Sequence, residues 1–63
     1  LIARLLPQAA QRLAPGGWLL VEVGPATAAE AERLVAGTTG LVAEPTLPDA
    51  AGLPRILQAR RPE

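Results

Sequence analysis

Glu22, Asp49 and Arg55 are the charged residues of this 63-residue chain whose places suit a binding site. Glu22 stands near the carboxyl end of an apolar segment, residues 18–23, that is typical of a buried strand. In open α/β sheets the ligand crevice lies outside the carboxyl ends of the strands. A carboxylate at this point can line a pocket or accept a hydrogen bond from a substrate, or it can anchor backbone amides or an arginine. We expect the anchoring role.

Asp49 and Arg55 flank Gly52 in a proline-rich loop. An aspartate side chain can accept hydrogen bonds from nearby backbone amides and so cap a turn. The Arg55 guanidinium can pair with Asp49 or brace the carbonyls of the loop. Substrate binding by either residue is the alternative, and a local structural clamp is the interpretation that we favour.

The residue types needed for several common chemistries are absent. The chain has no histidine and no cysteine, which excludes a Ser/His/Asp set and a disulfide and argues against a zinc site. Gly16 and Gly17 precede the predicted strand, whereas a phosphate-binding glycine loop follows a strand and opens a helix. We therefore predict no catalytic, cofactor-binding or metal-ligating residue within the chain.

Charge and hydropathy argue against other classes of partner. Six basic residues, all arginines, balance six acidic residues, so no basic stripe indicates direct binding to nucleic acid. No apolar run in the sequence is long enough to cross a membrane. The lack of cysteine agrees with a cytoplasmic protein.

The core that this chain can bury is thin. A domain of this length buries only about 60% of the surface that its unfolded chain exposes, and much of the 49% apolar content is alanine. Leu1 already belongs to an apolar helical pattern, which favours missing preceding sequence as the explanation. We expect residues 1–63 to be a C-terminal fragment of one larger domain, which can self-associate through exposed sheet edges.

Apolar periodicity predicts the order helix, strand, helix, strand, loop, strand. The predicted segments are residues 1–13, 18–23, 27–36, 41–44, 46–54 and 56–60. The first helix has an apolar stripe at i, i+4 spacing, formed by Leu1, Leu5, Ala9 and Leu13, with Ile2, Leu6 and Ala10 beside it. Pro7 either starts this helix or kinks it, and we favour a continuous or kinked helix.

Local signals set the remaining boundaries. Thr27 and Glu30 have the spacing of a capping box, and Pro45 is expected to end the strand before it. The strand at 18–23 is nearly all apolar, which predicts cover on both faces. Trp18, the first residue of that strand, should then be largely buried in the whole protein.

The segment order indicates an α/β fold. A helix separates the strands at 18–23 and 41–44, so they form a βαβ unit whose strands can run parallel with a right-handed crossover. The last strand follows without a helix, so it should run antiparallel to the strand before it. Three prolines in the connection reduce its unfolded-state entropy, and we expect an ordered loop.

Two segments resemble a known family. Residues 13–24 read L-A-P-G-G-W-L-L-V-E-V-G, which resembles the L-x-P-G-G-x-L-x-x-E-x-G segment of S-adenosylmethionine-dependent methyltransferases. Residues 49–55 read D-A-A-G-L-P-R, which resembles the terminal D-x-x-G-x-x-R of the HemK/PrmC-type protein-(glutamine-N5) methyltransferases. The resemblance extends over essentially the whole chain.

The resemblance implies that the chain is the C-terminal part of a Rossmann-like methyltransferase sheet whose last strand is antiparallel. It implies that the whole protein transfers a methyl group from S-adenosylmethionine to a glutamine of peptide chain release factors. The donor site and the Asn-Pro-Pro-Tyr catalytic motif would lie upstream, since this chain has no asparagine and no tyrosine. The chain alone should then be inactive, and Glu22, Asp49 and Arg55 are motif positions without an assigned role.

Two alternatives remain open at this point. In the first, the whole protein is a related methyltransferase that acts on RNA or on a small molecule, although the D-x-x-G-x-x-R segment favours a protein substrate. In the second, the chain belongs to a different class of protein: it is a complete small interaction module that assembles through exposed sheet edges.

Overall fold

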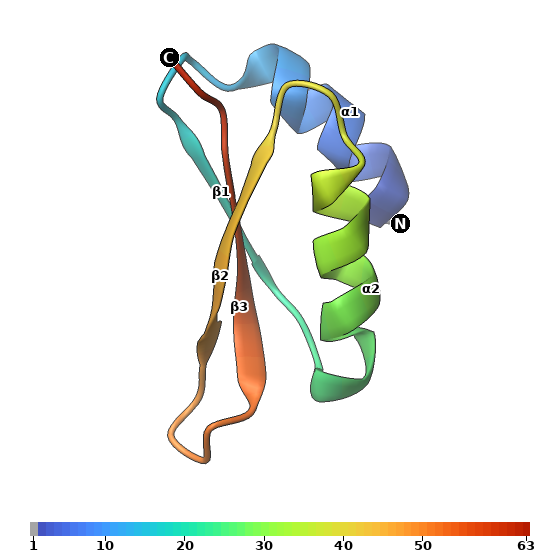
Figure 1. Cartoon of the computed structure of the whole chain (residues 1–63), viewed down its shortest axis with the longest axis vertical. Coiled ribbons are helices and arrows are strands. Elements are labelled where there is room, and N and C mark those ends of the chain that lie inside the picture. The colour runs from blue at the N-terminus through green and yellow to red at the C-terminus, as the bar shows by residue number, and fades with distance from the viewer. Residues whose placement is uncertain (1) are drawn as a thin grey trace.

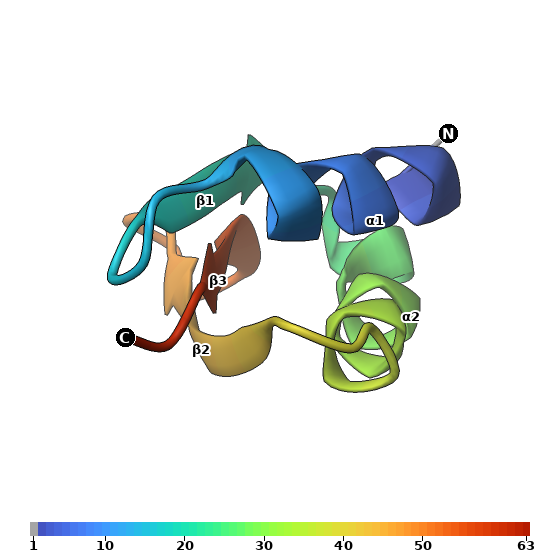
Figure 2. The same ribbon diagram turned by 90° about the horizontal axis from the view of Figure 1, so that it is seen from above.

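The computed structural model describes residues 2–63. Its elements are α1 (Ile2–Arg12), β1 (Trp18–Glu22), α2 (Pro25–Ala36), β2 (Val42–Pro48) and β3 (Pro54–Arg60). The strands form one sheet in the order β1-β3-β2, and both helices lie on the same side of it (Figures 1 and 2). The predicted α/β class and the predicted order of elements are confirmed.

The central strand of the sheet is the last in the sequence. β3 runs antiparallel to β1 and to β2, so β1 and β2 are parallel to each other, as a βαβ unit requires. They do not pair, because β3 returns through a short turn and occupies the place between them. The antiparallel pairing of β2 with β3 agrees with the prediction from the sequence.

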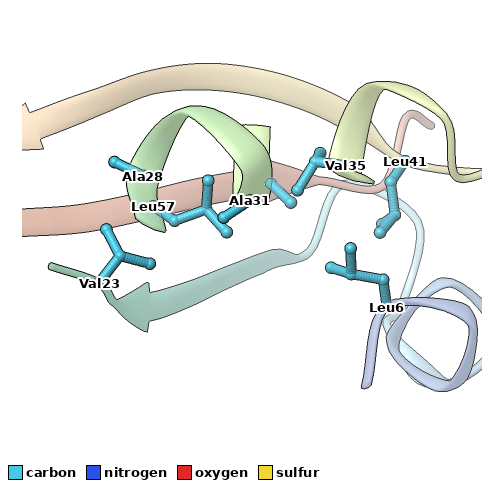
Figure 3. Packing of buried hydrophobic residues seen from close by; sticks show 8 residues of the cluster. Leu6, Val23, Ala28, Ala31, Val35, Leu41 and Leu57 are labelled. Carbon is cyan, nitrogen blue, oxygen red and sulfur yellow. The ribbon is translucent and has the colours of Figure 1, made fainter. Parts of the chain in front are cut away.

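The core lies between α2 and the sheet (Figure 3). From α2 it takes Ala28, Ala31 and Val35, and from β3 it takes Leu57 and Ala59. Alanine at most of these positions allows the helix backbone to approach the strand closely, which is why a chain with so few large side chains still encloses a core.

Helix α1 is continuous through Pro7. The predicted apolar stripe is confirmed at Ala9, which is buried, and at Leu13, which packs against the core, but it is wrong at Leu5, which is 40% exposed. The neighbouring Leu6 is 1% exposed. Figure 3 shows Leu6 pointing toward Leu41. The burial of Leu6 and Ala9 therefore defines the packed face of α1, and the Leu1 position of the predicted stripe lies outside the described residues.

Helix α2 begins two residues before the predicted first residue. Gly24 is the N-cap and Pro25 is the first helical residue, a position where proline loses no helical hydrogen bond. The Gly24 N–H donates to the Thr27 hydroxyl over 3.3 Å. Thr27 is therefore the third residue of the helix and not its N-cap residue. The predicted Thr27–Glu30 capping box is wrong. The predicted end at Ala36 is confirmed.

Pro45 does not end β2. The strand continues to Pro48, with a break in pairing register between Glu44 and Leu47. β2 is an edge strand, where a proline without an N–H costs no ladder bond if it faces away from the neighbour. Strand β3 likewise begins at Pro54, so the connection is residues 49–53 rather than 46–54.

The turn between α1 and β1 requires both of its glycines. Gly16 has φ +83°, a conformation that residues with a Cβ rarely adopt. A Cβ on Gly17 would lie 2.9 Å from the Ala14 carbonyl oxygen. Arg61 completes the turn, because its carbonyl accepts from the Gly16 N–H (2.7 Å) and its N–H donates to the Gly17 carbonyl (2.9 Å).

The Arg61 side chain also caps α1. Its guanidinium donates to the Leu13 carbonyl at 2.5 Å and to the Gln11 carbonyl at 3.4 Å. Cations near a helix C-terminus satisfy the last carbonyls and interact favourably with the helix dipole. The end of β3 therefore holds the end of α1 in place.

One face of β1 is left uncovered by residues 2–63. Trp18 is 49% exposed and Leu20 is 59% exposed, whereas Leu19 and Val21 pack against the core from the other face. The prediction that residues 18–23 are covered on both faces therefore fails for the chain as described, because both helices lie on one side of the sheet (Figure 2). The burial of Trp18 in the whole protein stays a prediction.

Candidate functional site

An open groove lies at the carboxyl end of β1, between the first turns of α2 and the start of α1. Its volume is about 450 Å³. The lining is Ile2, Val21, Glu22, Val23, Gly24, Thr27, Glu30, Ala31 and Leu34. The groove therefore has an apolar floor with two carboxylates and one hydroxyl, and no basic residue.

Glu22 is the last residue of β1 and pairs in register with Ile56. Glu22 is exposed, and its carboxylate accepts no hydrogen bond and forms no ion pair within residues 2–63. The expected anchoring of amides or of an arginine is thus not found in this part of the protein. Glu22 is a free carboxylate at the rim of the groove.

The groove contains one glycine, Gly24, at the start of α2. Gly24 has φ −94°, and a Cβ placed on it would meet only the Thr27 hydroxyl, at 3.9 Å. The backbone conformation and the packing within residues 2–63 therefore do not require glycine at this position. Pro25 supplies no N–H at the helix N-terminus.

Asp49 caps the β2–β3 turn, as the sequence predicts. Its carboxylate oxygen Oδ1 accepts from the N–H groups of Ala51 and Leu53, both at 2.9 Å. Gly52 has φ +84°, and its N–H donates to the Asp49 carbonyl at 3.0 Å. The aspartate and the glycine of the D-x-x-G-x-x-R segment therefore build a tight hairpin, which Figure 1 shows extending beyond the helices.

Arg55 does not complete this clamp. The residue lies in β3 and is exposed, and its guanidinium forms neither an ion pair with Asp49 nor a hydrogen bond within the described part of the chain. Its carbonyl accepts from the Val23 N–H at 2.7 Å. The structure thus brings Arg55 and Glu22 to neighbouring register positions at one end of the sheet and leaves Asp49 in the turn.

Replacing Asp49 with alanine is expected to lower the free energy of unfolding by about 1 kcal/mol, because two backbone amides lose their acceptor. Asp49→Asn keeps the oxygen that accepts both bonds and serves as the matched control, with most of the stability retained. Urea unfolding of the three proteins measures the difference. Equal losses for the two variants would show that the negative charge of Asp49, and not its geometry, stabilises the turn.

The polar contacts that join distant elements were not predicted from the sequence. Arg60 Nε lies 2.9 Å from Glu44 Oε2 across the sheet, and the Thr46 hydroxyl donates to the Glu32 carboxylate between β2 and α2. Neither pair is visible before the register of β2 and β3 is known. Among residues 2–63, no group of acidic side chains could hold a metal ion, and no helix is long and apolar enough to cross a membrane.

Comparison with known proteins gives two relatives. The chain is 47% identical over 57 residues, 90% of its length, to a protein of Bradyrhizobium diazoefficiens named release factor glutamine methyltransferase. It is 36% identical over 62 residues, 98% of its length, to a protein of the same name from Koribacter versatilis. The chain is a HemK/PrmC-type segment. It spans about a fifth of the length of these relatives, 19% and 21%.

The relationship to the HemK/PrmC type confirms the family inferred from residues 13–24 and 49–55. The match to the second relative takes in 62 of the 63 residues, so it includes both segments. No protein-family model matches the chain, and no solved structure matches it.

Proposed function

We propose that residues 1–63 are the C-terminal part of one methyltransferase domain. The whole protein would transfer a methyl group from S-adenosylmethionine to the side-chain amide of a glutamine in a peptide chain release factor. The observation that carries this proposal is the 47% identity over 57 residues to a protein with that name. A cytoplasmic location belongs to the proposal, because the chain has no cysteine and hence no structural disulfide.

The role of these 63 residues in the reaction is architectural. An amide nitrogen is a poor nucleophile, so the enzyme must act mainly by holding the amide and the methyl group in line. The chain has no asparagine and no tyrosine for the catalytic motif that the resemblance implies, and the polar side chains of the groove are those of Glu22, Glu30 and Thr27. The present segment supplies part of the sheet and two helices on which the reacting groups of the remaining protein are positioned.

The isolated chain is expected to bind S-adenosylmethionine negligibly and to transfer no methyl group. The reason is that the sequence has neither a glycine-rich loop after a first strand nor the acidic residue that binds the ribose after such a loop. Titration calorimetry with the chain and S-adenosylmethionine measures this directly. Saturable binding at micromolar ligand would place a donor site within these residues and contradict the architectural role.

The whole protein tests the proposed reaction. It is expressed from its complete reading frame and incubated with S-adenosylmethionine carrying a labelled methyl group and with a peptide chain release factor. Peptide mass spectrometry is expected to find one added methyl group on a single glutamine, and none when that glutamine is replaced by alanine. Labelling of RNA or of a small molecule instead, with an unmodified release factor, would favour the alternative methyltransferase classes.

A further inference from the structure

The turn of the β2–β3 hairpin lies beyond the carboxyl end of β1. Strand register places Glu22, the last residue of β1, and Leu47 of β2 on either side of Ile56. The hairpin continues past this level to its turn at residues 49–53 (Figure 1). In open α/β sheets, ligands bind outside the carboxyl ends of the strands. The hairpin therefore extends from the end of the sheet at which a substrate is expected to bind.

The turn of this hairpin is ordered without a partner. Asp49 Oδ1 accepts from the N–H groups of Ala51 and Leu53, both at 2.9 Å, and the Asp49 N–H donates to the Leu53 carbonyl at 2.8 Å. Pro48 and Pro54 flank the turn and fix the backbone φ angle on both sides of it. A binding element that is already ordered loses little conformational entropy when its partner arrives.

Leu53 and Arg55 are the side chains that the hairpin presents to a partner. Leu53 is 48% exposed in the turn, and a Cβ placed on the neighbouring Gly52 would meet nothing within 4 Å. Arg55 is exposed, and its guanidinium has no partner within residues 2–63. Arginine is enriched at protein–protein interfaces, and its fork of N–H groups binds carboxylate and carbonyl oxygens.

The hairpin borders the groove at the carboxyl end of β1. Val23, one of the groove residues, donates its N–H to the Arg55 carbonyl at 2.7 Å. Arg55 lies on the same face of β3 as Leu57, because side chains alternate along a strand, and Figure 3 shows Leu57 between β3 and α2. Arg55 is therefore on the face of the sheet that bears the helices and the groove.

The charges at this end of the sheet suit a polypeptide better than a nucleic acid. Glu22 and Glu30 contribute carboxylates to the groove and Thr27 contributes a hydroxyl, so the groove accepts hydrogen bonds, whereas Arg55 donates them. A polypeptide backbone supplies N–H donors and carbonyl acceptors side by side. A nucleic acid presents phosphate groups, which the two carboxylates repel.

We propose that the β2–β3 hairpin is a docking element for the protein substrate: Leu53 packs against an apolar side chain of the substrate, and the Arg55 guanidinium donates to its oxygen atoms. This inference rests on the proposed function, in which the substrate is a peptide chain release factor, and it adds a binding role to the architectural one. The bound segment is the one that flanks the methylated glutamine, because the ligand crevice of an open α/β sheet lies at this end.

Steady-state methylation by the whole protein tests the hairpin, with the KM for a peptide chain release factor as the readout. Arg55→Ala is expected to raise this KM by roughly 10-fold, the effect of truncating an important interface residue. Leu53→Ala is expected to raise it by about 5-fold, because covering a half-exposed leucine gives about half the effect of burying a whole one. The kcat and the KM for S-adenosylmethionine should stay within about 2-fold, since only binding of the protein substrate is lost.

Two further variants are the controls. Arg33→Ala removes an exposed arginine from the last turn of α2, at the other end of the sheet (Figure 1), and should leave the KM for the release factor unchanged. Leu53→Met keeps an apolar side chain of similar volume and should retain most of the affinity. Unchanged KM values for Arg55→Ala and Leu53→Ala, or a fall in kcat and thermal stability without a rise in KM, would overturn the proposal.

Cross-linking separates the docking role from the proposed reaction. The whole protein, with Leu53 replaced by the photoreactive residue p-benzoylphenylalanine, is irradiated with the release factor, and mass spectrometry is expected to locate the cross-link beside the methylated glutamine. A cross-link to a release factor that is not methylated would refute the proposed function and leave the docking role standing. Methylation without a cross-link and with unchanged KM values would do the reverse. A cross-link to another part of the same polypeptide would assign the hairpin to internal packing and contradict the proposal.

Discussion

Leu57→Ala is expected to lower the free energy of unfolding by about 2–5 kcal/mol, the usual cost of removing a buried leucine side chain. Leu57 is 1% exposed at the middle of the core, where Figure 3 shows it between β3 and α2. The substitution leaves a cavity, and the loss of stability is largest when the surrounding structure does not close it. We expect a loss in the upper part of the range, because β3 is held by a paired strand on each side and its backbone cannot move inward.

Leu53→Ala is the control for Leu57, since it removes the same atoms from a residue that is 48% exposed in the hairpin turn. Substitutions at such surface positions change stability by less than about 0.5 kcal/mol. Urea unfolding followed by circular dichroism gives both values. If the two substitutions cost the same, Leu57 does not lie in a packed core and the arrangement of α2 over β3 is wrong.

Leu6→Ala is expected to have the second large effect, again about 2–5 kcal/mol. Leu6 is 1% exposed and is the large side chain with which α1 enters the core cluster. Its removal leaves α1 attached by small or partly buried side chains, such as Ala9 and Ile2, and by its C-terminal contacts to Arg61. We therefore expect α1 to loosen, which hydrogen exchange of the α1 amides detects in addition to the loss of global stability.

The adjacent residue Leu5 provides the control for Leu6. It has the same side chain in the same helix turn but is 40% exposed, so Leu5→Ala should change stability by less than half as much as Leu6→Ala. The comparison also tests the rotation of α1, because the periodicity of the sequence placed Leu5 on the apolar stripe. A larger loss of stability for Leu5→Ala than for Leu6→Ala would show that Leu5, and not Leu6, faces the core.

The structure supplies physical reasons for four of the residues that carry the family resemblance. Gly16 adopts a positive φ and Gly17 lies too close to the Ala14 carbonyl for a side chain. Asp49 and Gly52 build the β2–β3 turn. Glu22 and Arg55 are different, because neither side chain has a partner within residues 2–63, and their contacts must be sought outside these residues.

The sequence by itself determined the features that depend on neighbours along the chain. The end of α2 at Gly37 and the cap by Asp49 follow from contacts within about four residues, which a local pattern can reveal. The turn at Gly16 and Gly17 was also predicted locally, from the conformational freedom of glycine, although Arg61 completes it. The antiparallel run of β2 and β3 also follows locally, because the predicted connection, residues 46–54, is too short for a helical crossover.

Only the tertiary structure decided the features that depend on distant partners. Pro45 can stay in a strand because β2 is the outer strand, and β2 is outermost because β3 inserts beside β1. Leu6 rather than Leu5 is buried because Val35 and Leu41 set the direction from which the core approaches α1. Arg61 caps a helix 48 residues away in sequence. Such contacts depend on the relative position of whole elements, which local periodicity does not encode.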